Sequence, residues 1–310
     1  MLTPTQKQTA QALVNIFETG SVLGDYGNVT LIAGDTGHLT YGRSQTTLGS
    51  GNLADLLRRY CGNPGARFGA RLSEWLPRVE ATDLALDHDN RLHNVLRACA
   101  DDPVMRDTQD QFFDDVYWAP AMRAAEKLGI VTALGSAVVY DSMVHGSWGL
   151  MRDRTTQTVG APSAIGEKAW IMAYVETRRH WLANHPRRDL RATVYRVEAL
   201  QRLVAQGRWG LDLPLVVRGN EISLLALRST PPGCYDGPQP GSRMLSLQSP
   251  LIRGLDSRLV QLAMSDVGID VKADGVFGPH SIVCLKQYQQ QKGLPVTGVA
   301  DPALVVQMTG

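Results

Sequence analysis

The fold is decided by one stretch, Gly34-Asp35-Thr36-Gly37-His38-Leu39-Thr40-Tyr41-Gly42, which predicts a β-hairpin in an otherwise helical chain. The run before it, Val29 to Ala33, is β-like, and His38 to Tyr41 can form the return strand. Residues 34–37 supply four turn-forming residues between the two runs, and short strands joined in this way make a hairpin. We therefore expect one small antiparallel sheet near the start of the chain.

Helical periodicity fills most of the chain on both sides of this hairpin. The first helix can begin at a cap of Thr3 or Thr5 and end at Gly20, because apolar residues recur at helical spacing between them. After Leu53 one helix follows another, and we predict helices that begin near Asp102 or lie at 128–140, 165–183 and 192–206. One small sheet among many helices predicts a mainly α (α+β), two-lobed fold.

The composition of the chain changes at about residue 229. Residues 230–242 contain four prolines and three glycines, which cannot continue a helix and are typical of a linker. Beyond them helical periodicity resumes, and residues 245–310 contain five basic and five acidic residues, so this part cannot bind a ligand through net charge. We therefore divide the chain into a domain at 1–228, a linker at 229–248 and a small domain at 249–310.

The bulk composition argues against several kinds of partner. Hydrophobic residues make up 44% of the chain, charged residues 20%, and the net charge is +1, so no binding to nucleic acid is expected. The longest nearly apolar run, residues 128–140, is too short to span a bilayer, so no membrane insertion is expected. Met1 is followed by a mostly polar stretch through Thr9, which does not resemble a secretory signal.

Neither the cysteines nor the histidines form a metal-binding pattern. His88 and His93 lie among acidic residues at irregular spacing, which favours a solvated loop over a metal site. The cysteines are too sparse for a disulfide framework, although a single bridge stays open; they are Cys61, Cys99, Cys234 and Cys284. We expect no metal and no cofactor.

Glu18 is the first candidate for an acid catalyst. It lies in the last turn of the first predicted helix, where the negative end of the helix dipole disfavours a carboxylate. Burial beside Phe17 would act in the same direction and favour the protonated acid. The alternative is a solvated surface carboxylate, which is common near helix ends.

Asp35, in the predicted hairpin turn, is the second candidate. By itself it reads as a turn residue whose side chain bonds to nearby backbone amides. Together with Glu18 it gives a carboxyl at a helix end followed by a carboxyl on the next hairpin. Glycosidic hydrolysis needs such a pair, because one acid protonates the leaving oxygen while one base activates water. Thr40, on the return strand, can hold that water with its hydroxyl.

The order of these residues resembles the catalytic region of glycoside hydrolase family 46 chitosanases. It is also similar to the acid–hairpin–threonine layout of phage lysozymes. The resemblance to the chitosanases covers most of residues 10–220 and implies a lysozyme-like, two-lobed catalytic domain. Further segments follow in family order, namely Asp102-Pro103-Val104, Tyr117-Trp118-Ala119-Pro120-Ala121, Tyr140-Asp141, Val144-His145-Gly146, Tyr174 to Arg178, Arg196-Val197 and Gly210-Leu211-Asp212-Leu213-Pro214-Leu215.

Carried onto this sequence, the resemblance implies an inverting hydrolase. Glu18 would be the general acid and Asp35 the base that activates water, with Asp25 as the alternative base; Thr40 would help to position the water. A supporting network behind the acid would consist of Asp141, Arg178 and Arg196. A purely structural ion-pair cluster is an equally good interpretation of those three residues.

The C-terminal part resembles the small three-helix peptidoglycan-binding domain. The resemblance rests on Asp274-Gly275-Val276-Phe277-Gly278-Pro279, on Leu285, Tyr288 and Gln289, and on Gly293-Leu294-Pro295-Val296-Thr297-Gly298 with Asp301. These are mainly residues that shape the fold, so they identify the domain better than the side chains that contact a ligand.

Asn52 bears on the substrate. Family 46 chitosanases place an acidic residue in a Gly-Thr-Gly-Asp-like stretch after the hairpin, where it pairs with a substrate ammonium. The corresponding stretch here is Gly49-Ser50-Gly51-Asn52, and an amide suits an uncharged, N-acetylated sugar better. We therefore interpret the chain first as a lysozyme (muramidase) that cleaves peptidoglycan.

Two alternatives stay open, a chitosanase that hydrolyses β-1,4 glucosamine linkages and a non-catalytic wall-binding protein. The expected partner is bacterial cell-wall glycan, and the sequence identifies no delivery machinery or immunity protein. We expect synthesis in the cytoplasm without an evident signal peptide and action in the periplasm or at the cell wall, as for an endolysin or a secreted effector. The route stays open.

Overall fold

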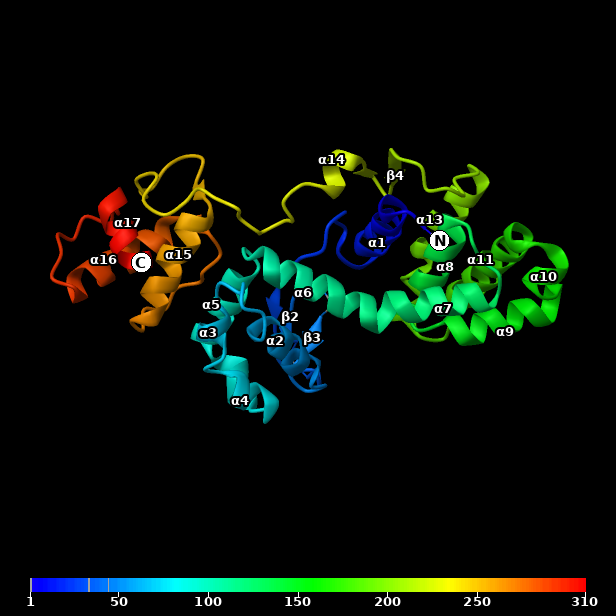
Figure 1. Cartoon of the computed structure of the whole chain (residues 1–310), viewed down its shortest axis with the longest axis horizontal. Helices are drawn as coiled ribbons and strands as arrows, with labels where there is room; N and C mark the ends of the chain where they lie inside the picture. Colours follow the sequence, from blue (N-terminus) through cyan, green and yellow to red (C-terminus); the bar gives the residue numbers. More distant parts are fainter. Residues whose placement is uncertain (1, 33, 44) are drawn as a thin grey trace. The chain divides into compact units, whose positions relative to one another are not determined.

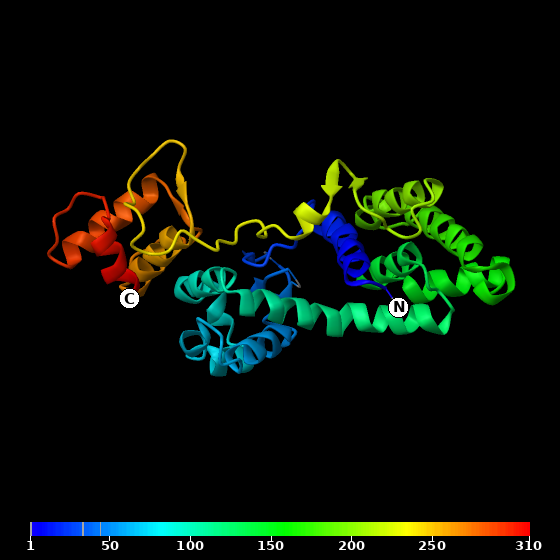
Figure 2. The same ribbon diagram turned by 45° about the horizontal axis from the view of Figure 1, so that its top comes forward.

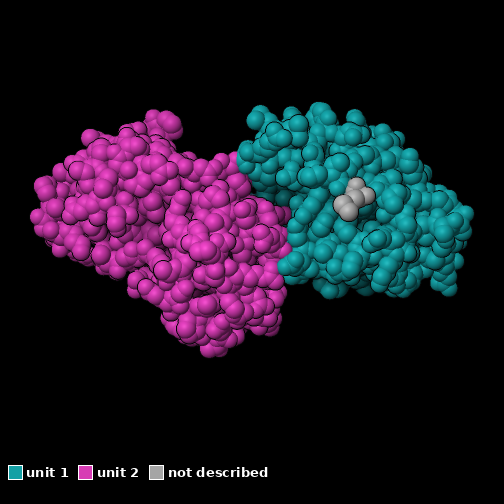
Figure 3. Space-filling model, viewed as in Figure 1, with its two compact units in different colours: residues 1–24, 113–229 teal, residues 25–112, 230–310 magenta. Residues whose placement is uncertain are grey.

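The structure is a computed structural model that describes residues 2–32, 34–43 and 45–310. The chain forms two compact units, shown in different colours in Figure 3. The first unit consists of residues 1–24 and 113–229, and the second of residues 25–112 and 230–310. Helices dominate both units and the sheets are small, so the predicted mainly α (α+β) fold class is confirmed (Figure 1).

The first unit begins with α1 (Pro4–Thr19), whose ends lie close to the predicted ones. Thr3 caps it: the Thr3 hydroxyl accepts from the backbone N–H of Gln6, and the Gln6 side chain accepts from the backbone of Thr3. Gly20 ends it in the left-handed conformation, with φ of 74°. The buried face of α1 packs against α8 (Ala133–Val144) in the core of the unit.

The helix predicted at 128–140 begins later than expected. Gly129, with φ of 70°, separates α7 (Ala119–Lys127) from the residues that follow. The side chain of Thr132 then caps α8 by accepting from the backbone N–H of Gly135. Residues 128–132 are therefore a connection, although α8 itself is as buried as the apolar run predicts.

Three long helices surround α8: α9 (Trp148–Val159), α11 (Glu167–Ala183) and α13 (Val194–Ala205). The helix predicted at 165–183 is α11, which begins two residues later than predicted because Gly166 adopts φ of 87° and separates it from α10 (Pro162–Ile165). The helix predicted at 192–206 begins at Val194, after the short α12 (Arg188–Arg191). Sequence analysis missed the hairpin of β4 (Leu215–Val217) and β5 (Asn220–Ile222), which precedes α14 (Leu224–Leu227).

The second unit contains the predicted hairpin, in a shorter form. Strand β1 (Val29–Thr30) pairs antiparallel with β2 (Thr40–Tyr41), which pairs with β3 (Thr46–Thr47), a strand that was not predicted. The predicted first strand continued to Ala33, which lies outside the described residues. Leu31 and Ile32 are exposed and outside β1, and with no buried face to fill, nothing holds them in a sheet.

Helices complete the N-terminal part of the second unit. They are α2 (Asn52–Cys61), α3 (Gly69–Leu72), α4 (Leu76–Glu80), the 3₁₀ helix η1 (Leu84–His88), α5 (Asn90–Cys99) and α6 (Pro103–Phe113). The helix predicted to begin near Asp102 starts at Pro103, and its α-helical part ends at Phe113. It continues as a π-helical turn, η2 (Asp114–Trp118), so one extra residue per turn changes which side chains share a face.

The C-terminal part of the second unit contains the three helices that the resemblance implied. They are α15 (Leu255–Asp266), α16 (Pro279–Gln291) and α17 (Pro302–Thr309), seen in orange to red in Figure 2. Phe277, Leu285 and Met264 are fully buried in their shared core. A two-stranded sheet of β6 (Ile252–Arg253) and β7 (Val276–Phe277), which was not predicted, closes this part.

Helix α15 packs directly on α5, so contacts between helices, as well as the chain connection, join the C-terminal part to the rest of the second unit. Arg258 of α15 forms a buried ion pair with Asp101 at 3.0 Å and donates to the carbonyl of Arg97 at 2.6 Å. The Asn94 side chain donates to the carbonyl of Val271 at 2.7 Å. Leu262 of α15 belongs to the apolar core beneath the hairpin.

The predicted linker has no helix or strand in residues 230–242, as its composition indicated. It is nevertheless held against the second unit, because the backbone N–H of Tyr235 donates to Asp101 at 2.7 Å and Arg106 pairs with Asp236 at 2.9 Å. The predicted linker is therefore not a segment without contacts to the part of the chain beside it.

Other sequence expectations concern residue chemistry. The four cysteines are free thiols, so the single bridge that the sequence left open is absent, and Cys99 and Cys284 are buried in helices. The prediction of a solvated loop around His88 and His93 is wrong: His88 ends η1, and His93 lies in α5, where it is buried and its Nε2 bonds to the carbonyl of Leu86 at 3.0 Å. Within the described part of the chain, no helix is long and apolar enough to cross a membrane.

Candidate active site

Glu18 lies where α1 ends, and this end is fixed from α13. The Tyr195 hydroxyl donates to the carbonyl of Phe17 at 2.6 Å, and the next residue, Arg196, donates to Glu18 Oε1 at 2.5 Å. Asn15 donates to the carbonyl of Val22 at 3.0 Å and holds the loop that follows. The Glu18 carboxylate is therefore held in one place while its side chain stays 37% exposed.

Behind Glu18 lies a buried cluster of the three residues that were predicted to support it. Arg196 donates to Asp141 Oδ1 from Nε at 3.0 Å and from Nη2 at 2.7 Å. Arg178 donates to the other oxygen of Asp141 at 2.5 Å and to the Ser147 hydroxyl at 3.0 Å. The structure thus brings Glu18, Asp141, Arg178 and Arg196 together, and the effect of the cluster on Glu18 stays a prediction.

The charges of this cluster balance. Two carboxylates, Glu18 and Asp141, face two guanidiniums, so the cluster is neutral when all four groups are ionised. Burial raises the pKa of Asp141, but Arg196 and Arg178 outweigh burial and leave that pKa below its usual value. Asp141 therefore stays ionised and keeps both guanidiniums in place.

His145 is a member of this environment that the sequence analysis assigned no role. Burial, together with the charges of Arg178 and Arg196, lowers the pKa of His145 to about 4. The imidazole is consequently neutral near pH 7 and adds no third positive charge. Tyr195 and Ser147 were not predicted as site residues either. Their only signal in the sequence is their position: Tyr195 precedes Arg196, and Ser147 follows the His145-Gly146 pair.

Asp35 lies in the turn of the hairpin, as predicted. The backbone N–H of Gly37 donates to Asp35 Oδ1 at 3.2 Å, and the carboxylate is exposed. This is the Asx-turn geometry of the turn-residue interpretation, and it leaves the second carboxylate oxygen available. The structure is therefore compatible with both roles that the sequence left open for Asp35.

The return strand that carries Thr40 is held by Asp87. This carboxylate accepts from the backbone N–H of Leu39 at 2.9 Å and bonds to His38 Nδ1 at 2.8 Å. Thr40 is buried, and its hydroxyl donates to the carbonyl of His38 at 3.1 Å. The hydroxyl oxygen retains lone pairs to accept from a water, so the predicted role of Thr40 stays a prediction.

Asn52 is brought close to the hairpin by a tight contact between two loops. The backbone N–H of Gly49 donates to the carbonyl of Gly37 at 3.0 Å, and a Cβ at Gly49 would lie 2.3 Å from the carbonyl oxygen of Thr36. Only glycine fits there. Asn52 begins α2 three residues later with an exposed side chain.

The alternative base, Asp25, is at the first residue of the second unit. Desolvation raises the pKa of Asp25 against the opposing hydrogen bonds from the backbone N–H groups of Gly27 and Asn28. The predicted site residues are thus divided: Glu18 and its cluster belong to the first unit, and Asp25, Asp35, Thr40 and Asn52 to the second. Across residues 2–32, 34–43 and 45–310, no cluster of His, Cys, Asp and Glu side chains could hold a metal ion.

Comparison with known proteins identifies the family. Residues 12–215, more than half of the chain, match glycosyl hydrolase family 46. The chain belongs to glycosyl hydrolase family 46. Residues 250–308 match the family described as a peptidoglycan binding domain. Both resemblances drawn from the sequence are therefore confirmed, and the family 46 chain is a glycoside hydrolase.

The relatives of this family 46 chain are chitosanases. The chitosanase of Bacillus subtilis (strain 168) is 30% identical over 239 residues, which cover 71% of this chain and 84% of the relative. A mutant chitosanase from Bacillus subtilis MY002, solved in complex with six GlcN units, is 26% identical with a TM-score of 0.58 and covers 72% of this chain and 98% of its own. The Gynuella sunshinyii chitosanase, solved with chitotetraose, is 26% identical with a TM-score of 0.56 and covers 72% and 99%.

Proposed function

We propose that this family 46 hydrolase is a chitosanase, which cleaves β-1,4 glucosamine linkages by an inverting, two-carboxylate reaction. The observation that carries the proposal is the fixed Glu18 carboxylate in contact with a buried Arg196–Asp141–Arg178 cluster, in a chain whose relatives are chitosanases. The sequence analysis placed peptidoglycan first and chitosan second. The relatives support the opposite order.

In this proposal Glu18 protonates the leaving oxygen. A protonated Glu18 leaves the cluster with one surplus positive charge, because Arg196 and Arg178 then face only Asp141. After the proton has been transferred to the glycosidic oxygen, the ion pair with Arg196 holds the resulting Glu18 carboxylate in place. The fixed position of Glu18 supports this role further, because a general acid must be held within reach of the atom that it protonates.

The base of the proposed reaction is Asp35, which removes a proton from the attacking water, and Thr40 orients that water. The exposed carboxylate with one oxygen outside the Asx turn supports this assignment. Asp25 stays the alternative. Inversion is implied by the family and would be observed as an α-anomeric product from a β-linked substrate.

The decisive experiment offers highly deacetylated chitosan and purified sacculi in parallel and identifies the products by mass. Glucosamine oligomers from chitosan, without soluble muropeptides, are the expected result. The Glu18→Gln protein, treated in the same way, excludes activity from a contaminant. Muropeptides from sacculi with no release from chitosan would replace this proposal by the second candidate.

The second candidate is a muramidase, and two observations favour it. The C-terminal part matches a peptidoglycan-binding family, and Asn52 stands where the chitosanase pattern has an acid for the substrate ammonium. An amide forgoes the charge-assisted hydrogen bond to an ammonium. In either case we propose that the C-terminal part holds the enzyme on bacterial cell-wall glycan, and that the enzyme acts in the periplasm or at the wall.

A further inference from the structure

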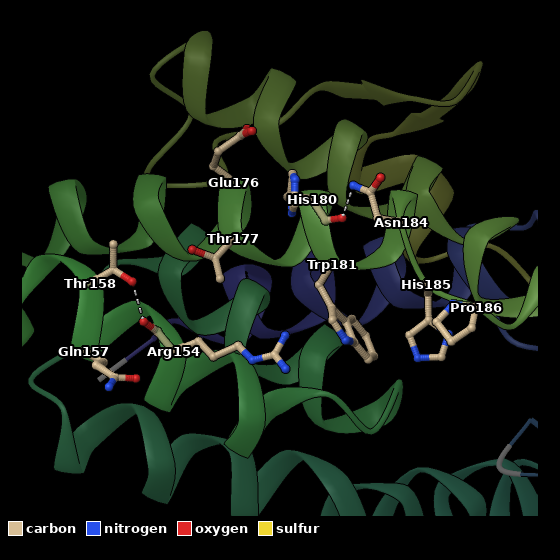
Figure 4. Close-up of a pocket in the computed structure, with 10 residues that line it drawn as sticks. All are labelled: Arg154, Gln157, Thr158, Glu176, Thr177, His180, Trp181, Asn184, His185 and Pro186. Atoms are coloured by element: carbon tan, nitrogen blue, oxygen red, sulfur yellow. Dashed lines mark hydrogen bonds between the residues drawn. The ribbon is translucent and has the colours of Figure 1, made fainter.

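A polar groove lies on the first unit, between α9 and the C-terminal half of α11 (Figure 4). Its volume is about 690 Å³, within the range of sites for small molecules. None of its lining residues belongs to the cluster behind Glu18. The side chains that line it include Arg154, Gln157, Glu176, His180, Trp181 and Asn184.

Trp181 supplies a fixed aromatic surface in this groove. Its ring is partly buried against the core of the first unit, and the ring of His185 meets it edge-on, with centroids 4.8 Å apart. Figure 4 shows the indole projecting from α11 toward the side chain of Arg154, which reaches across from α9. A fixed indole beside polar groups suits a ligand with an apolar face and a polar edge, as a pyranose ring has.

The lining of the groove contains one guanidinium, that of Arg154, and one carboxylate, that of Glu176. Its one lining acid, Glu176, is engaged by Arg179 at 2.7 Å and by Gln201 at 2.6 Å, and the bond from Arg179 holds the pKa of Glu176 below its usual value. The guanidinium of Arg154 forms no hydrogen bond or ion pair with the residues that the structure describes. The hydroxyl of Thr158 donates to the backbone carbonyl of Arg154 and does not occupy its side chain. Without the buried Arg178, residues 150–191 contain seven Lys or Arg and four Asp or Glu, so the surface around Arg154 is positive.

Neutral polar groups complete the lining. Asn184 donates to the carbonyl of His180 at 2.8 Å, which leaves its own amide oxygen free to accept a hydrogen bond. Gln157 is exposed on the opposite wall, formed by α9. Amide side chains of this kind bond to hydroxyl and acetamido groups without selecting for charge.

We propose that this groove binds a sugar that carries a carboxylate. The indole of Trp181 packs against the sugar ring, Arg154 pairs with the carboxylate through charge-assisted hydrogen bonds, and the amides bond to the remaining substituents. The same positive charges repel the ammonium of glucosamine, so the groove is not a further site for a chitosan chain. The proposal does not depend on which glycan the enzyme cleaves.

Two sources offer this chemistry, the lactyl carboxylate of N-acetylmuramic acid in peptidoglycan and the carboxylate of a uronic acid in an extracellular polysaccharide. Calorimetric titration of the full chain with N-acetylmuramic acid, N-acetylglucosamine, glucuronic acid and glucosamine separates them. We expect N-acetylmuramic acid to bind at least about tenfold more tightly than N-acetylglucosamine, which has the same ring without the carboxylate. Binding of glucuronic acid alone would assign the uronic source.

The variants locate the site. Arg154→Gln should weaken binding of the acidic sugar about tenfold or more and Trp181→Ala should weaken it as well, whereas chitosan hydrolysis by Arg154→Gln should equal that of the wild type. Arg152→Gln is the matched control, because Arg152 lies on the same helix, does not line the groove and pairs with Asp153. Equal affinity of wild type and a folded Arg154→Gln protein, or equal affinity for the acidic and neutral sugars, would overturn the proposal.

Discussion

Each unit contains a buried Arg–Asp pair, and the two pairs differ in what they contact next. Arg196–Asp141 in the first unit has side chains 3% and 1% exposed, and Arg258–Asp101 in the second has side chains 4% and 0% exposed. Arg196 continues to Glu18, a carboxylate that solvent reaches. Arg258 continues to three backbone carbonyls, those of Arg97 in α5, Gly233 in the linker and Asp274 in the C-terminal part. The same pair of residue types therefore supports a candidate catalyst in one unit and joins the C-terminal part to the other.

The two aspartates also differ in ionisation. Burial raises the pKa of Asp141, but two guanidiniums outweigh it and leave the pKa below its usual value. Burial prevails at Asp101, although the charges of Arg258, Arg106 and Arg67 oppose it, and the pKa rises to about 7. A buried Arg–Asp pair is therefore no sign of catalysis by itself; what distinguishes the first pair is its contact with an exposed carboxylate.

We expect the largest loss of activity from a substitution of Glu18, the exposed residue of the cluster in the first unit. We expect Glu18→Gln to lower the rate of chitosan hydrolysis by about 10²–10⁴-fold or more, because the amide keeps the shape of the side chain and has no acidic proton to transfer. Thermal unfolding should show that the protein remains folded. Near-normal turnover by the folded variant would remove Glu18, and with it the catalytic meaning of the cluster.

In the second unit we expect the exposed Asp35 of the hairpin turn, and not the buried Arg258–Asp101 pair, to take part in the reaction. We expect Asp35→Asn to lower the rate by about 10²-fold or more while the substrate still binds, because the base acts on water. Asp25→Asn, measured beside it, should have the smaller effect. The reverse ranking would make Asp35 a turn residue and Asp25 the base.

Much of the fold followed from sequence patterns. The cap at Thr3 and the stop at Gly20 gave the first helix its ends, and the three C-terminal helices followed from the resemblance. The failures were local: Gly129 and Gly166 delay the start of two predicted helices, and the strands β3 to β7 contain only two or three residues. Strands this short leave no alternating pattern to detect.

The site was predictable to the extent that motifs fix it. The sequence predicted Glu18 and the three residues behind it, because the resemblance to family 46 chitosanases relates residues that lie more than a hundred positions apart in the chain. Neutral His145 and the hydroxyl of Tyr195 were not found, because their roles depend on burial and on a carbonyl that only the folded chain brings near. The fixed linker was missed for the same reason, since Asp101 gives no local signal that it meets Tyr235.

Removing the arginine of each pair should separate stability from activity. We expect Arg196→Met and Arg258→Met each to lower the free energy of unfolding by about 3–5 kcal/mol, because each leaves a buried carboxylate without its partner. Only Arg196→Met should also lower the kcat of the protein that remains folded. Denaturant unfolding gives the first quantity, and assays well below the melting temperature give the second. A loss of kcat in Arg258→Met comparable to that in Arg196→Met would make the second pair part of the catalytic machinery.

The smallest expected effect is a difference in pH dependence between the two units. The pKa of Asp101 in the folded chain, about 7, lies above its ordinary value of 3.8, so the folded state binds the extra proton between these values. The stability that Asp101 contributes is therefore complete below about pH 4 and is lost as the pH rises toward 7. The pKa of Asp141 is lowered instead, so its contribution is present above pH 3.8 and is lost only in stronger acid.

Hydrogen exchange between pH 4 and 7, corrected for the intrinsic exchange rate, tests this difference because it reports the local opening of each segment. Protection of α5 and α15 should fall as the pH rises. Protection of α8 should instead rise between about pH 4 and 6.5, because the pKa of His145 at the end of α8 is lowered to about 4 in the folded chain. Asp101→Asn should remove the slope in α5 and α15, since the amide cannot titrate, and leave α8 unaffected. A slope that persists in the Asp101→Asn protein would assign it to another group. In that case the two buried pairs would differ only in the groups that their arginines contact, and not in the ionisation of their aspartates.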